Sequence, residues 1–279
     1  MDQPPLAYAE FAPGAAVQDL VVNYWSFTVR RLPWEAFRHA VWPDGCVSLS
    51  VALVDGRPVA TPLLGPRREP YLVDVAAGTQ YWGIRFRPEM GPAALSRPAS
   101  SLRDQVGPAH HWFGVEPIAR LERAIAEALD AFGPLPTGDL VEAAVALAFD
   151  RWLFDAADTT HPPEAAIRDA VRAIVATEGR VPIATVAELV GLSMRHLQRG
   201  FKDAVGLSPK EYALIRRGRH ALRSMVDRGG AAGDMARVAV ESGYADQAHL
   251  ARDFRRLLHG SSEQLRQRLF AIEHSTLLD

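Results

Sequence analysis

The first ninety residues alternate short apolar runs with turn-forming residues. Four of these runs are rich in β-branched and aromatic residues: 21–30, 37–42, 46–54 and 80–86. Turn formers such as Asp55-Gly56 separate them. This pattern is typical of strands joined by tight turns, and it predicts a small antiparallel β-sheet or barrel.

Beyond Pro88 the apolar residues recur every three and four positions, which is the spacing of an amphipathic helix. Two such helices are predicted, over 115–132 and 139–154, and they complete the N-terminal unit. From Glu164 onward the chain is predicted to be helical throughout, with short interruptions at glycines. The fold class is therefore α+β, with accessory helices on the sheet domain and an all-α C-terminal domain.

The boundary between the two units is predicted from the segment 155–163, which combines acids and threonines with a double proline. We expect an N-terminal domain at 1–157, a linker at 158–163 and a helical domain at 164–279. A length of 279 residues fits two domains.

The helical half contains an internal repeat. In both copies an alanine precedes a glycine by four positions: Ala187 and Gly191, then Ala239 and Gly243. A leucine and a phenylalanine spaced by four follow each glycine: Leu197 and Phe201, then Leu250 and Phe254. Two copies of one supersecondary unit are thus predicted, at about 183–206 and 235–260.

Each copy has the features of a helix-turn-helix. The alanine allows two helices to cross closely, the glycine supplies a tight turn, and the leucine and phenylalanine pack the second helix on the first. We expect Ser193 and Asp246 to cap the second helices. The side chains predicted to face outward are Arg195, Gln198 and Arg199 in the first copy and Gln247, His249 and Arg252 in the second.

The outward residue types suit base recognition, because Arg and Gln can each form two hydrogen bonds to a guanine or an adenine edge in the major groove. The charge distribution agrees. Residues 1–160 carry 13 Arg and no Lys against 19 acids, whereas residues 180–268 carry 16 basic residues against 9 acids. A basic module beside an acidic one is typical of a nucleic-acid-binding domain joined to a regulatory domain.

The C-terminal half, from Glu164 to about Arg268, resembles the AraC/XylS-type transcriptional regulators. The resemblance rests on the segment 192–201 (LSMRHLQRGF), on Gly206-Leu-Ser-Pro209 with Tyr212, and on the segment 243–254 (GYADQAHLARDF). It implies a DNA-binding domain with two helix-turn-helix units joined by a long helix. The end of the second copy departs from the family, because Glu263 stands where a proline is usual and Leu265 stands where Tyr212 stands in copy one.

The joining helix is predicted over 209–228, starting at Pro209 and ending at Gly229-Gly230. At 1.5 Å per residue its roughly 19 residues span about 28 Å, which is comparable with the ~34 Å between successive major-groove faces. One chain could then contact two consecutive grooves. Arg216 on this helix is a candidate for a phosphate contact, with a solvated face as the alternative.

The N-terminal half is similar to a sensor-type domain of unknown function found on some AraC-type regulators, through Asn23-Tyr24-Trp25, the segment 42–46 (WPDGC) and the segment 83–88 (GIRFRP). Trp25, Trp42 and Trp82 could line an effector pocket or form plain core. An inward-facing Arg85 needs an anion, supplied by an acidic side chain or by a ligand.

Two other functions compete with the sensor hypothesis. An effector-independent regulator would use its N-terminal domain for dimerisation only, through the apolar faces of 115–132 and 139–154. A metal-dependent β-barrel enzyme would need clustered ligands, but His39 is the one histidine in the first ninety residues and Cys46 has no histidine near it in sequence. We predict no catalytic residue, metal or cofactor, and expect Cys46 to be a buried hydrophobic residue.

The predicted partners are double-stranded DNA, a small-molecule effector, a second copy of the chain and, for an activator, RNA polymerase. The single cysteine excludes an intramolecular disulfide and favours a reducing compartment. No apolar stretch approaches the ~20 residues of a spanning helix, and no targeting segment precedes the first strand. We therefore expect a cytoplasmic protein that does not contact membranes.

Overall fold

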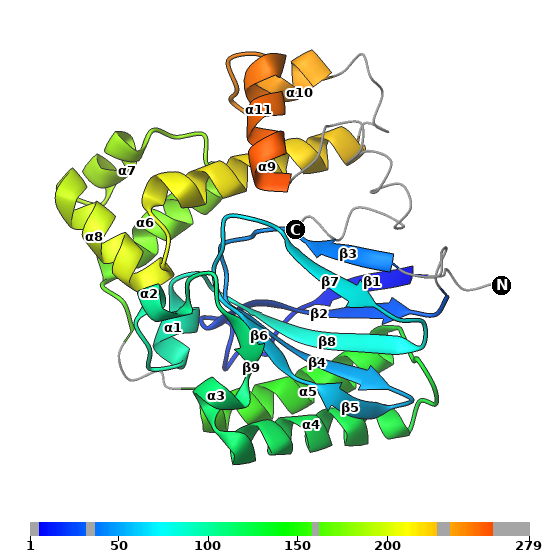
Figure 1. Ribbon diagram of the computed structural model, residues 1–279. Coiled ribbons are helices and arrows are strands. Elements are labelled where there is room, and N and C mark those ends of the chain that lie inside the picture. Colours follow the sequence, from blue (N-terminus) through cyan, green and yellow to red (C-terminus); the bar gives the residue numbers. More distant parts are fainter. Residues whose placement is uncertain (1–5, 32–36, 158–161, 228–234, 259–279) are drawn as a thin grey trace.

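A computed structural model describes residues 6–31, 37–157, 162–227 and 235–258 (Figure 1). The N-terminal part is antiparallel β-structure, as predicted, and its strands form two sheets. The strands are β1 (Leu6–Phe11), β2 (Val21–Val29), β3 (Phe37–Val41), β4 (Ser48–Val54), β5 (Arg57–Ala60), β6 (Pro62–Leu64), β7 (Tyr71–Val75), β8 (Thr79–Phe86) and β9 (Val106–Pro108). The larger sheet has the order β1-β2-β8-β4-β6-β9 with β5 on β4, and β3 pairs with β7 in the smaller sheet.

Alternation along β8 gives the larger sheet two different faces. Trp82, Ile84 and Phe86 are fully buried on one face, under helices α4 (Val115–Asp130) and α5 (Asp139–Ala156). Tyr81 and Arg85 lie on the opposite face. Figure 1 shows α4 and α5 below the sheet, and the small β3-β7 sheet above it on the side of the C-terminal helices.

Three short helices follow the sheet: α1 (Met90–Ala94), α2 (Ala99–Leu102) and α3 (His110–Phe113). The C-terminal helices are α6 (Ala165–Ala176), α7 (Ile183–Leu189), α8 (Met194–Val205), α9 (Pro209–Asp227), α10 (Met235–Glu241) and α11 (Gln247–Leu258). They share one core, in which Leu197, Phe201, Leu250 and Phe254 are fully buried. The all-α C-terminal region is confirmed.

The predicted strands and helices lie within a few residues of the observed ones. The strands β1, β5, β6, β7 and β9 and the three short helices were not predicted. They are three to six residues long, too short to show a clear period. The domain boundary stays a prediction, because residues 158–161 of the linker lie outside the described part, as do Glu263 and Leu265.

Candidate nucleic-acid interface

The first helix-turn-helix unit consists of α7 and α8. Gly191 has φ +68°, a left-handed conformation that glycine adopts without strain. The backbone N–H of Leu192 donates to the carbonyl of Ala187 at 2.9 Å, which closes the end of α7. The chain then turns directly into α8.

The second unit, α10 and α11, repeats this turn. Gly243 has φ +75° and the backbone N–H of Tyr244 donates to the carbonyl of Ala239 at 2.9 Å. Both second helices also carry the same kind of cap: Ser193 Oγ accepts from the N–H of His196 at 3.3 Å, and Asp246 Oδ1 accepts from the N–H of His249 at 2.6 Å. The predicted repeat is therefore present in its turns and in its caps.

The outer faces of α8 and α11 carry the residues predicted to contact DNA. Five of the six are exposed: Arg195, Gln198, Arg199, Gln247 and Arg252. His249 is half-buried, with its ring 5.1 Å from the ring of Tyr244 and Nε2 3.9 Å from Asp253 Oδ2. Each helix thus presents a polar stripe at the surface, opposite its buried leucine and phenylalanine.

The seventh residue predicted to contact DNA, Arg216, lies on α9 and not on α8 or α11. Its side chain is 15% exposed, and Nη2 donates to Glu178 Oε2 at 3.1 Å. The ion pair joins α9 to the turn that follows α6. In this conformation the guanidinium faces a carboxylate of the same chain, and the predicted phosphate contact remains a prediction.

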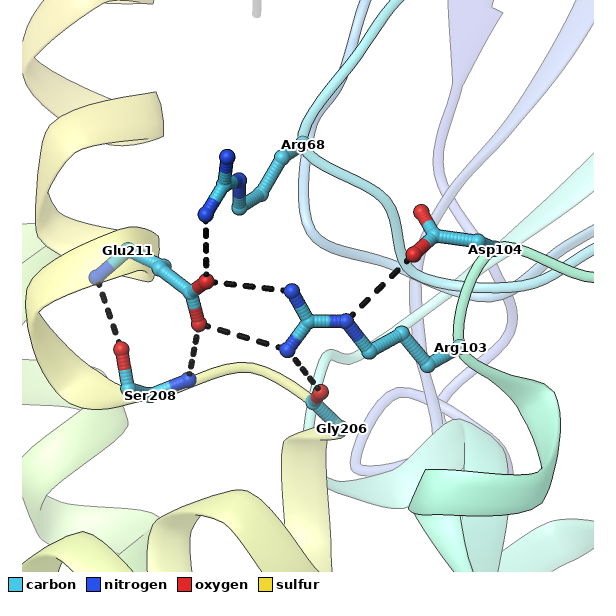
Figure 2. A network of polar contacts seen from close by, with 6 residues as sticks. All are labelled: Arg68, Arg103, Asp104, Gly206, Ser208 and Glu211. Carbon is cyan, nitrogen blue, oxygen red and sulfur yellow. Dashed lines mark hydrogen bonds and ion pairs between the residues drawn. The ribbon is translucent and has the colours of Figure 1, made fainter.

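The first unit is joined to the sheet domain by an ion-pair network around Glu211, shown in Figure 2. Arg103 Nη2 and Arg68 Nη1 donate to Glu211 Oε1 at 3.1 and 3.0 Å. Arg103 Nη1 also donates to the carbonyl of Gly206, which ends α8, at 3.3 Å. Glu211 and Ser208 exchange hydrogen bonds at the start of α9, as a capping box does.

This network determines the charge of Glu211. Burial acts to raise the pKa of its carboxyl group, but the N–H of Ser208 and the guanidinium groups of Arg103 and Arg68 outweigh burial and lower the pKa to about 2. The carboxylate therefore stays ionised at neutral pH. It holds the two arginines against the first unit.

A second contact lies at the turn after β3. Gly45 has φ +77°, and a Cβ atom there would lie 2.6 Å from the ring of Tyr212 on α9. Tyr212 is fully buried and Trp42 packs against the same helical core. Helices α1 and α2 in addition pack against α8. The sheet domain is thus docked on the first unit over several elements.

The residues predicted to form an effector pocket do not lie together. Trp82 is 0% exposed on the face covered by α4 and α5, where its ring meets Phe11. Trp42 packs on the C-terminal core. Trp25 and Arg85 share the other face of the sheet, with Trp25 lying over Gly83.

Arg85 is balanced by acidic side chains, which was one of the two alternatives expected for it. Its side chain is 11% exposed, with Nη1 2.7 Å from Glu10 Oε1 and Nε 2.9 Å from Asp44 Oδ2. Asp44 precedes Gly45, so this ion pair also fixes the turn that packs on Tyr212. Cys46 is buried, as predicted, and burial raises the pKa of its thiol.

Sequence reasoning missed the junction residues Arg68, Arg103 and Glu211. One signal was present, because Ser208 and Glu211 form an S-x-x-E capping pattern. Nothing in the sequence indicated that two distant arginines would bind this glutamate. Within the described residues, no three His, Cys, Asp or Glu side chains are grouped to hold a metal ion. The helices of that same part are all too short or too polar to span a bilayer.

Comparisons with known proteins agree with these observations. Residues 186–268 match the model of a helix-turn-helix domain, and residues 9–108 match the model of a domain of unknown function, DUF6597. No curated protein matches the chain.

The chain is also similar to solved structures of other proteins. A transcriptional regulator with an AraC-type DNA-binding domain from Chromobacterium violaceum is 23% identical, with a TM-score of 0.33 over 37% of this chain and 90% of that one. ToxT from Vibrio cholerae is 10% identical, with a TM-score of 0.47 over 90% of this chain and 99% of that one. A ToxT structure with bound unsaturated fatty acid is 10% identical, with a TM-score of 0.44 over 99% and 100%.

The two family models cover most of the elements described above. DUF6597 covers strands β2 to β9 with helices α1 and α2, and the helix-turn-helix model covers most of both repeated units. The resemblance of the sequence to AraC/XylS-type regulators thus agrees with two matches: DUF6597 in the N-terminal half and a helix-turn-helix domain in the C-terminal half.

Proposed function

We propose that the protein regulates transcription by binding specific sequences of double-stranded DNA with α8 and α11. The observation that carries this proposal is the repeated unit itself: two capped helices, each buried on one side and presenting exposed Arg and Gln on the other. Most solvated helices carry polar residues. A turn, a cap and an exposed polar stripe that all repeat in a basic half of the chain are a much more specific sign of DNA binding.

The base contacts follow from side-chain chemistry. Arg199 and Arg252 occupy equivalent positions, two residues after the buried Leu197 and Leu250. We assign each to a guanine edge in its own half-site, and Gln198 to an adenine edge. Arg195, Gln247 and His249 complete the two faces. Helix α9 has 19 residues, a length of about 28 Å that suits two successive major grooves.

Arg216 is proposed as a phosphate contact only in a conformation that opens its ion pair with Glu178. Its side chain would then leave a partly buried position, which costs the energy of that contact. We therefore expect Arg216→Ala to weaken binding to all DNA sequences alike and by less than the loss of a base contact.

The proposed dimer uses the outer side of α5. The inner sides of α4 and α5, which were expected to serve dimerisation, pack on their own sheet through residues such as Ile125 and Phe149. Leu140, Leu147 and Phe154 recur every seven residues and are 78%, 50% and 80% exposed. A seven-residue apolar repeat suits packing against a like helix of a second copy.

The dimer is tested by replacing two residues of this exposed stripe. Leu147→Lys with Phe154→Glu should convert a dimer into a monomer in light scattering, without loss of helical circular dichroism. Arg120→Glu with Glu127→Lys, at exposed positions of α4, is the control, because it likewise leaves the net charge unchanged. A wild-type protein that is monomeric at all accessible concentrations would refute the dimer and leave DNA binding untouched.

We further propose that a small-molecule effector controls DNA binding. The face that carries Trp25, Tyr81 and Arg85 is where an anionic effector could act, since it would compete with Glu10 and Asp44 for the guanidinium. Asp44 is next to the turn that packs on α9. An effector changes DNA affinity only if it binds the two domain arrangements differently, and about 1 to 3 kcal/mol of coupling would change affinity 5- to 150-fold.

The experiment that tests the main proposal is in vitro selection of duplexes from a random library by the full-length chain. We expect an enriched sequence with two conserved blocks, bound more tightly than a scrambled duplex at every salt concentration. Equal affinity for selected and scrambled duplexes would refute a sequence-specific regulator. A thermal-shift screen of anionic metabolites, followed by titration of the selected duplex with any hit, tests the effector separately.

A further inference from the structure

A groove of about 500 Å³ opens between the two helix-turn-helix units. Residues from α8, α9, α11 and the sheet domain line it. Lys202 belongs to the last turn of α8, Lys210 and Glu211 to the first turn of α9, and Arg256 to the last turn of α11. Arg103 of the sheet domain completes the wall. The groove is therefore formed by both units and by the docked N-terminal domain together.

The lining of the groove is strongly basic, with four cations around one carboxylate. Glu211 is occupied by Arg103 and Arg68, as Figure 2 shows. Across the described ranges no carboxylate comes within ion-pair distance of Lys202, Lys210 or Arg256. Three exposed cations that face one groove, and that form no ion pair with a described carboxylate, create a local field that attracts anions.

The positions of two of these cations connect the groove to the outer faces of α8 and α11. Lys202 is three residues after Arg199 and seven after Arg195, so the three share one face of α8. Arg256 is four residues after Arg252 and seven after His249, and shares one face of α11. The two stripes proposed to contact bases thus both end in this groove.

We propose that the groove binds phosphates of the DNA backbone between the two half-sites, through Lys202, Lys210 and Arg256. This inference rests on the proposed function. A duplex read in two successive major grooves passes its intervening backbone between the two reading helices, and phosphates accept hydrogen bonds from Lys and Arg. Arg103 shapes the groove from the sheet domain, so the docked N-terminal domain forms part of the DNA-binding surface.

The test compares the full-length wild type with the variant Lys202→Ala, Lys210→Ala, Arg256→Ala. A control variant, Arg57→Ala, Arg120→Ala, Arg123→Ala, removes the same charge from exposed positions on β5 and α4, on the side of the sheet away from the C-terminal helices (Figure 1). Affinity for the selected and the scrambled duplex is measured over a range of KCl concentrations.

Each phosphate neutralised contributes about 0.9 to the slope of log affinity against log salt. We therefore expect the groove variant to lose about 2 to 3 from that slope on both duplexes, while its preference for the selected over the scrambled duplex is kept. The control variant should keep the wild-type slope. Where the triple variant fails to fold, the single changes Lys202→Gln, Lys210→Gln and Arg256→Gln should each lower the slope by about 0.9.

Equal slopes for the groove and control variants would overturn the proposal. Inorganic pyrophosphate provides the second arm, measured by calorimetry without DNA. If the groove variant loses pyrophosphate binding but keeps the wild-type DNA slope, the groove is a site for free phosphorylated molecules and the DNA assignment is wrong. A wild type without preference for the selected duplex would instead refute the proposed function, whereas the slope comparison would still report on the groove.

Discussion

The two helix-turn-helix units have the same turns and caps but are held in different ways. The first unit is fixed from outside: α1 and α2 pack against α8, and Arg103 donates both to the end of α8 and to Glu211. The second unit is fixed mainly from inside the helical region, because α11 packs on α9 and α10. The repeat thus preserves the local fold while the surroundings of its copies differ.

Contacts with α9 show how the second unit is held. Leu257 packs against Gly218: a Cβ atom at position 218 would lie 2.6 Å from Cδ1 of Leu257. The guanidinium of Arg217 lies 4.6 Å from the centre of the Tyr244 ring, within reach of a cation–π interaction. Arg217 Nη2 is also 3.5 Å from Asp253 Oδ2. These contacts join the second unit to the middle of α9.

The difference teaches where regulation could act. A change in the sheet domain reaches the first unit directly, through Gly45, Arg103 and Glu211, and reaches the second through α9. Binding to two successive grooves depends on the relative placement of the units. Under the proposed function, the sheet domain can therefore affect DNA affinity through the placement of the first unit and of α9.

The largest expected effect is a loss of stability on breaking the contact between Gly45 of the sheet domain and Tyr212 of α9. Gly45→Ala places a side chain at φ +77° and against the Tyr212 ring, costing about 1 to 2 kcal/mol for the backbone conformation and a further ~1 to 3 for the overlap. Gly56→Ala is the matched control, because Gly56 has φ +73° and nothing within 4 Å. Thermal unfolding should show the first cost in both variants and the second only in Gly45→Ala; equal losses would mean that the junction does not pack as described.

The next effect sharpens the comparison of the two reading helices. Arg199→Ala and Arg252→Ala should each cost about 1 to 3 kcal/mol of DNA binding and relax base preference in one half-site, a different one for each variant. Repeating the duplex selection with each variant measures this. If both variants relax the same block, or neither does, the assignment of one helix to each half-site is wrong.

The smallest effect concerns the charge at the junction. Glu211→Gln keeps a capping side chain but loses the ion pairs with Arg68 and Arg103, and should lower the free energy of unfolding by about 1 kcal/mol at pH 7. The folded carboxyl has a pKa of about 2, below its ordinary 4.5. The stabilisation is therefore complete above pH 4.5 and is lost as the pH falls toward 2.

Urea unfolding of wild type and Glu211→Gln at several pH values measures this difference. The gap between the two proteins should shrink as the solution is acidified. A gap that stays constant from pH 7 to pH 3 would show that Glu211 is not ionised by its arginine partners.

The sequence predicted the parts of the molecule that depend on local rules. Gly191 and Gly243 were expected at tight turns and have positive φ, and Ser193 and Asp246 cap the helices as expected. Long strands such as β8 and long helices such as α5 were also correctly placed, because they show a clear period over many residues.

Features that depend on distant partners could not be predicted. Arg85 was expected to need an anion, but its partner Glu10 lies 75 residues away on a strand that was not predicted. Arg103 and Glu211 are 108 residues apart, and the capping pattern of Ser208 and Glu211 does not indicate an arginine partner. Trp82 was grouped with Trp25 as a pocket residue, although opposite faces of the sheet separate them once the register of β2 and β8 is known.

The central claim is that one chain uses two reading helices on two successive major grooves. Base-resolved footprinting of the selected duplex with the full-length wild type tests it most directly, with Arg199→Ala and Arg252→Ala alongside. The account predicts two protected patches, centred about 10 base pairs apart on one face of the duplex, with one patch lost in each variant. A single patch, or two patches that both variants leave intact, would contradict it.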